Sequence, residues 1–240
     1  MSKRTCGTGA WAATGALALL AAGCGLGGVD GNGQRGTELR AAEGFSAIES
    51  RGALDVELAR GDQFQVEVSI DANLLGRVHT DVVGDVLVIE EDAIGDTVAG
   101  PHVIVAMPVL RRATLRGSGG LRAAGFQQAD PVSLELAGSG DLSFAGDVPR
   151  VDLVVSGSGN ARLSGVAPSV GMALSGSGDV GARGLDATTA DVSLSGSGNV
   201  VATVSGSARV TLSGSGDVDL FGSAALDRVD ISGSGTVRQH

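Results

Sequence analysis

A G-S-G tripeptide recurs seven times in the C-terminal half of the chain, and no other feature narrows the choice of fold as much. The central serines are Ser118, Ser139, Ser158, Ser177, Ser197, Ser215 and Ser234. Successive tripeptides lie 18 to 21 residues apart, with a mean near 19. A period this short lies at the low end of solenoid repeats and favours a coil of β-strands over a pair of helices.

The residues around each G-S-G keep a fixed apolar register. Two places before the tripeptide stand Leu115, Leu136, Val155, Leu174, Leu194, Leu212 and Ile231. Four places before it stand Ala113, Leu134, Leu153, Met172, Val192, Val210 and Val229. Three places after the serine stand Leu121, Leu142, Ala161, Val180, Val200, Val218 and Val237. Alternation with mostly polar neighbours predicts strands with one inward face, so each coil has two strands and two turns and pairs in parallel with the next.

A polar position follows the G-S-G in five repeats. It holds Asp141, Asn160, Asp179, Asn199 and Asp217. We interpret this row as a structural turn ladder, in which Asp and Asn cap nearby N–H groups. Calcium is the alternative, but carboxylates two coils apart would be separated by roughly 10 Å, too far to share one ion directly. The end repeats carry Gly120 and Thr236 instead, as expected where a stack needs capping.

The N-terminal half shows a two-residue apolar alternation between Phe45 and about Leu110, which predicts strands. We expect a hairpin across Arg60–Gln63, a turn at Gly84-Asp85 and a short helical turn within residues 71–78. The predicted fold class is all-β. It is a parallel β-helix, or β-solenoid, of about 19-residue coils over residues 113–240, preceded by a β-rich segment with hairpin-like strands.

The first residues resemble an export signal. Lys3 and Arg4 precede an uncharged apolar stretch, and L-A-A-G-C at residues 20–24 resembles a bacterial lipobox. We therefore expect a lipoprotein signal peptide over residues 1–23, lipidation of Cys24 and a Gly-rich flexible tether over residues 24–43. The protein would be an exported lipoprotein, anchored in a membrane and facing the periplasm or the cell surface. The alternative is an ordinary signal peptide with a chance cysteine near its cleavage site.

Composition excludes several classes of function. The formal net charge is −10, so the chain lacks the basic face that nucleic-acid binding requires. Its three histidines lie in separate segments, and no repeated serine has a distinctive His and acid partner. We therefore expect no catalytic residues, no cofactor and no metal site.

Several segments resemble one family. They are G-F-S-A-I-E-S-R-G-A-L-D-V-E-L from Gly44, D-A-N-L-L-G-R-V-H-T-D-V from Asp71, V-L-V-I from Val86, and the serial G-S-G-D-V units. In order and spacing they resemble the putative auto-transporter adhesin, head GIN domain family, over residues 44–240. The resemblance implies a right-handed parallel β-helix, similar in shape to pectin lyases but without their catalytic residues.

The expected function is a non-enzymatic adhesion module of the cell envelope. Its partners would be a membrane, through the lipid anchor, and an envelope or surface protein or glycan. The alternatives are a polysaccharide-active lyase or hydrolase on a β-helix, and a periplasmic structural or signalling accessory.

Overall fold

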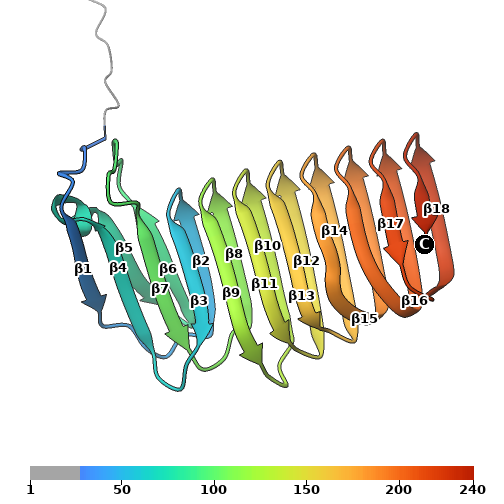
Figure 1. The fold of residues 1–240 in the computed structure, drawn as a ribbon, viewed down its shortest axis with the longest axis horizontal. Coiled ribbons are helices and arrows are strands. Elements are labelled where there is room, and N and C mark those ends of the chain that lie inside the picture. The colour runs from blue at the N-terminus through green and yellow to red at the C-terminus, as the bar shows by residue number, and fades with distance from the viewer. Residues whose placement is uncertain (1–27) are drawn as a thin grey trace, which may run out of the picture.

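The computed structural model describes residues 28–240, which form a β-solenoid with two long faces (Figure 1). Face A consists of the parallel strands β6 (Val86–Glu91), β2 (Ala47–Gly52), β8 (Arg112–Gly117), β10 (Val132–Gly138), β12 (Arg150–Gly157), β14 (Ser169–Gly176), the second halves of β15 (Val180–Gly196) and β16 (Val200–Gly214), and β18 (Ala225–Gly233). Face B consists of β7 (His102–Met107), β3 (Asp55–Arg60), β9 (Gly120–Gln127), β11 (Asp141–Asp147), β13 (Asn160–Val166), the first halves of β15 and β16, β17 (Val218–Phe221) and β19 (Val237–Gln239). The predicted solenoid of about 19-residue coils is confirmed.

The predicted inward rows pair as the repeat requires. Leu136 lies between Leu115 and Val155 in adjacent strands, and each of the three side chains is fully buried. The row on face B behaves alike, since Leu142 pairs with Leu121 and with Ala161. Stacked identical positions therefore build one continuous core out of small and medium-sized side chains.

The G-S-G tripeptides form the corner that joins face A to face B. The first glycine of every tripeptide has a φ between 119° and 141°, which only glycine adopts readily. A Cβ on Gly176 would overlap the backbone of Gly157 in the preceding coil. The corner therefore needs glycine both for its conformation and for the close approach of stacked coils.

The order of the coils in space differs from their order in the chain. The coil made of β2 and β3 lies between the β6–β7 coil and the β8–β9 coil. The predicted hairpin across Arg60–Gln63 is therefore wrong. Its two strands, β3 and β4 (Gln65–Asp71), both pair with β7, which lies between them. Apolar alternation identified the strands correctly, but it carries no information about which strand becomes the neighbour.

The N-terminal end of the solenoid is capped. Strands β1 (Arg35–Arg40) and β4 extend face B in antiparallel fashion, and β5 (Val78–Val83) extends face A through a hairpin with β6. Gly84, at a φ of 66°, occupies the turn of that hairpin, which confirms the predicted turn. The predicted helical turn is the 3-10 helix η1 (Ala72–Arg77), whose Leu74 is fully buried at this end.

Residues 28–43, which the sequence analysis assigned to a flexible tether, are packed against this cap. Strand β1 pairs with β4 along its whole length, and Val29 forms a bridge with Ile94. The glycine-rich composition hid these contacts, because their partners lie 26 to 65 residues away in the chain. Cys24 and the predicted signal peptide lie outside the described residues.

Asp71 holds this segment in place. Its carboxylate accepts hydrogen bonds from the N–H groups of Gly33, Val98 and Ala99, at 2.5, 3.1 and 3.2 Å. Burial raises the pKa of Asp71, but these three backbone donors outweigh it and leave the pKa below its ordinary value. A buried, ionised carboxylate thus joins the end of β4 to the segment around Gly33 and to the loop at residues 98–99.

The C-terminal end is different. Val229 and Ile231, predicted to face the core, are 37% and 48% exposed, because no described strand lies beyond β18. Their counterparts one coil earlier, Val210 and Leu212, are 1% exposed. Within residues 28–240, no helix is both long and apolar enough to span a membrane.

Candidate interaction surface on face B

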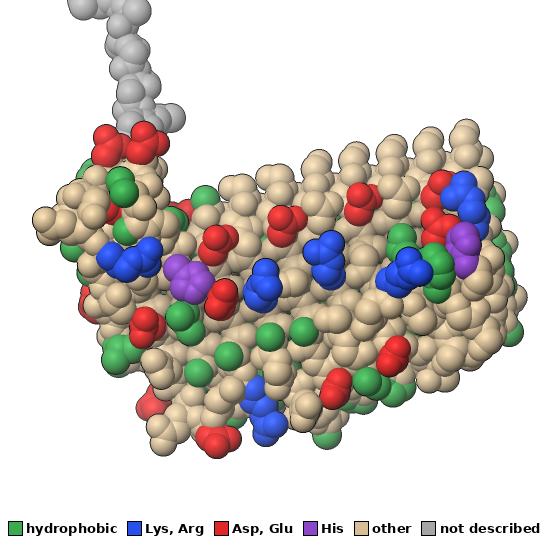
Figure 2. Space-filling model, in the orientation of Figure 1, with side chains coloured by type: hydrophobic (Ala, Val, Ile, Leu, Met, Phe, Trp, Pro, Cys, Tyr) green, Lys and Arg blue, Asp and Glu red, His purple; other side chains and the backbone are tan. Residues whose placement is uncertain are grey.

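The outer surface of face B carries a long, open polar groove of about 1010 Å³. It runs from β7 to β17, across the coils, so that successive coils contribute side chains from equivalent positions. Figure 2 shows acidic and basic side chains arranged in rows along this face. The first row contains the predicted ladder, and the second lies two residues further along each strand.

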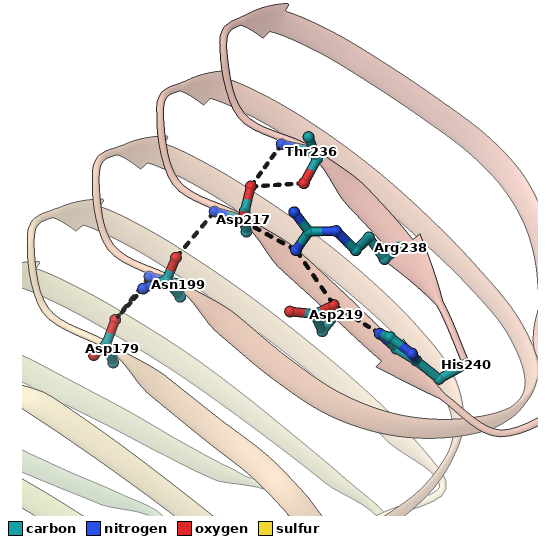
Figure 3. A network of polar contacts seen from close by, with 7 residues as sticks. All are labelled: Asp179, Asn199, Asp217, Asp219, Thr236, Arg238 and His240. Atoms are coloured by element: carbon teal, nitrogen blue, oxygen red, sulfur yellow. Dashed lines mark hydrogen bonds and ion pairs between the residues drawn. The ribbon is translucent and has the colours of Figure 1, made fainter.

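The first row is a hydrogen-bonded ladder that links consecutive coils. Asp179 accepts the backbone N–H and the side-chain amide of Asn199, at 2.9 and 3.0 Å, and Asn199 accepts the backbone N–H of Asp217 at 3.1 Å. Figure 3 shows this run of contacts. Nearer the middle of the solenoid, the side-chain amide of Asn160 donates to Asp141 at 3.1 Å, and Asn160 accepts the N–H of Asp179 at 3.2 Å. The N–H groups that these oxygens bind belong to the next coil, rather than to the same turn as the sequence suggested.

The second row contains two arginines with exposed guanidinium groups. Arg122 and Arg162 flank Ser143, so they are two coils, or about 10 Å, apart. Within residues 28–240, neither guanidinium forms an ion pair. Two exposed cations beside a row of fixed acceptors can each donate to a ligand that lies across the coils.

The C-terminal end of the groove is a tighter network (Figure 3). Asp217 accepts from the hydroxyl and the N–H of Thr236, at 2.7 and 2.9 Å, and from Arg238 at 3.1 Å. The Thr236 hydrogen bonds, followed by the charge of Arg238, hold the pKa of Asp217 below its ordinary value. Asp219 contacts His240 at 2.8 Å, and the His240 ring stacks on Phe221.

Sequence reasoning missed three parts of this surface. Asp55 extends the ladder, since it accepts the N–H of Gly120 at 2.9 Å. A signal was present, because G-A-L-D-V at residues 52–56 matches the G-S-G-D-V unit, but Asp55 belongs to the coil inserted out of chain order. Arg122 and Arg162 also stand at one fixed offset from their G-S-G serines.

The histidines lie apart and contact single carboxylates. His79 lies 3.3 Å from Asp92, and His102 lies 3.7 Å from Glu57. Among residues 28–240, no group of three or more His, Cys, Asp or Glu side chains is arranged to hold a metal ion.

These features define the class of protein: a parallel β-solenoid, capped at one end, with a polar ladder along one face. The chain belongs to the family described as putative auto-transporter adhesin, head GIN domain, whose model matches residues 44–224. The comparison with curated proteins found no match.

Solved structures share this fold at low sequence identity. A putative adhesin from Bacteroides fragilis NCTC 9343 has a TM-score of 0.79 and 16% identity, over 89% of this chain and 100% of that one. A putative adhesin from Parabacteroides distasonis ATCC 8503 has a TM-score of 0.69 and 21% identity, over 88% and 99%. A protein from the same strain, described as a putative lipid binding protein, has a TM-score of 0.66 and 21% identity, over 88% and 99%. At these identities the likeness shows the fold alone.

Proposed function

We propose that the protein is a non-enzymatic interaction module of the cell envelope that binds an extended polar glycan along the groove of face B. The observation that carries the proposal is the groove itself, which crosses successive coils and has an Asp or Asn side chain at the ladder position of most of them. An extended polymer can repeat the same contact from coil to coil. The adhesin descriptions of the family and of its structural relatives agree with this role.

The polar groups of the groove suit binding better than catalysis. Asp217, whose pKa lies below its ordinary value, already accepts a hydrogen bond from the backbone of the next coil. Such donors favour the ionised form, whereas a general acid in glycoside cleavage requires a raised pKa. Turnover of any member of a polysaccharide panel would favour the enzymatic alternative.

A glycan array probed with the purified protein tests the proposal. The key variant is Arg122→Ser with Arg162→Ser, since serine already occupies the same row at Ser143. The control is Arg209→Ser, which removes an exposed arginine on face A. We expect the double variant to lose binding about tenfold or more and the control to bind like the wild type. Equal losses in the two proteins, or no retained glycan, would refute the role of the groove.

We further propose that acyl groups on Cys24 hold the module at a membrane. Dual acylation gives a stable anchor, and the N-terminal segment enters the solenoid at its capped end. Radiolabelled palmitate should enter the wild-type protein but not Cys24→Ala. Equal labelling of the two proteins would exclude the anchor and leave the groove proposal unaffected.

A further inference from the structure

Within residues 28–240, the coil made of β18 and β19 has an open sheet edge and an uncovered part of the core. Among the described strands, β18 pairs only with β16 and β19 pairs only with β17. Leu226, Val229 and Ile231 continue the inward rows of face A, yet they are 39%, 37% and 48% exposed. An open strand edge with apolar side chains beside it favours pairing with another strand.

We propose that this end binds a second copy of the same chain, edge to edge, so that two solenoids join through their C-terminal coils. A two-fold axis normal to face A would place β18 antiparallel to β18 of the second copy. Face B then meets face B in the same way, and the apolar side chains nearest the axis on the inner side of β18 lie against each other.

The charges of β18 select one register. If the axis passes through Val229, Arg228 of each copy lies opposite Asp230 of the other. A shift that centres the pair on Asp230 would place two carboxylates directly opposite each other, which is destabilising. Arg228 and Asp230 point outward and already form an ion pair within the strand, so the dimer would gather both pairs into one network of alternating charge.

The balance of charge at this end also favours a second copy. Residues 222–240 contain two Asp and two Arg, whereas the whole chain has a net charge of −10. Contact through the C-terminal coils therefore brings together the neutral ends and leaves the acidic remainder of each molecule apart.

The assembly closes at two copies. The opposite end of the solenoid is covered by β1, β5 and η1, with Leu74 and Ile70 fully buried beneath them. An isologous contact uses the same end of both molecules, so this interface is complete in the dimer and does not by itself propagate into a fibre. The two N-terminal segments then lie at opposite ends of the dimer, which suits contact between copies on facing membranes; this last consequence alone rests on the proposed anchor.

A single cysteine on the two-fold axis tests the interface. The variant Val229→Cys is made in the full chain with Cys6→Ser and Cys24→Ser, so that position 229 carries the only thiol. The residues at position 229 of the two copies would then lie opposite each other at a Cα separation of about 4.5–5.5 Å, within the range that a disulfide spans. We expect oxidation to give a linked dimer. Thr211→Cys, exposed on face A one coil away from the edge, should stay unlinked.

Charge reversal tests the register without touching the core. Sedimentation should show a dimer for the unlinked background, and Arg228→Asp should raise the dissociation constant about tenfold or more, because each copy then opposes two carboxylates. Adding Asp230→Arg should restore the dimer. The proposal would be overturned by a monomer at every soluble concentration or by a dimer that is insensitive to Arg228→Asp. It would also be overturned by open-ended oligomers, or by a disulfide-linked product that is no stronger for Val229→Cys than for Thr211→Cys.

Discussion

Replacing Gly176 with alanine should destabilise the solenoid far more than replacing Gly181, five residues further along the same coil. Gly176 is the first glycine of its G-S-G and has a φ of 132°. Its added Cβ would overlap the Gly157 carbonyl oxygen in the preceding coil. Gly181 has an ordinary backbone conformation, and its added Cβ would have no neighbour nearer than the Ala161 carbonyl oxygen at 3.9 Å.

Two costs add at Gly176. Holding a non-glycine residue in this region of backbone space costs about 1–3 kcal/mol. The overlapped oxygen also accepts the N–H of Ser177 at 2.9 Å, and loss of that hydrogen bond at the packed corner costs about 1–3 kcal/mol. We therefore expect Gly176→Ala to lower the free energy of unfolding by about 2–6 kcal/mol, a large share of the typical 5–15 kcal/mol. Gly181→Ala should be neutral or slightly stabilising, within about 0.5 kcal/mol.

Urea titration followed by far-ultraviolet circular dichroism measures the difference. The chain has no Tyr, and its single Trp lies at position 11, so aromatic fluorescence would not report on the solenoid. The midpoint should fall for Gly176→Ala and stay in place for Gly181→Ala, with similar slopes for both. Equal midpoints for the two variants would show that the corner tolerates a Cβ and that the stacking explanation of the repeat is mistaken.

Two further predictions concern carboxylates that contact the backbone. Asn199→Asp would place three carboxylates in consecutive coils and remove the amide hydrogen bond to Asp179. We expect a loss of about 1 kcal/mol or more, of which added salt recovers the like-charge repulsion but not the lost hydrogen bond, and a loss wholly independent of salt would contradict this. Asp71 has a folded pKa below its unfolded value, so its stabilisation is present above about pH 4 and is lost as the pH falls through the folded pKa. Asp71→Asn should therefore flatten the acid limb of a plot of unfolding free energy against pH, and an unchanged acid limb would show that Asp71 does not hold the cap.

The repeat could be predicted from sequence because its cause is local and periodic. An inward residue such as Leu136 is surrounded by its own counterparts one coil away, so the period alone fixes its neighbours. The glycine corner is equally predictable, since a positive φ and a close backbone approach leave one residue type. The ladder residues could be placed in one row for the same reason, although the coil-to-coil direction of their hydrogen bonds could not.

The N-terminal half was harder to predict because its contacts are neither local nor periodic. Nothing in the alternation of β3 and β4 shows that β7 separates them, since each is an ordinary strand with one apolar face. The packing of residues 28–43 depends on Asp71, whose partners Gly33 and Ala99 are distant in sequence.

The sequence by itself determined the coil, its corner and its inward rows, because a repeat that stacks on itself carries its own partner. Only the tertiary structure decided where the stack begins and ends. It inserts the β2–β3 coil out of chain order, closes one end with β1, β5 and η1, and leaves Val229 and Ile231 uncovered at the other. The ends of a solenoid are the places where the period stops supplying the next neighbour, so their contacts cannot be read from it.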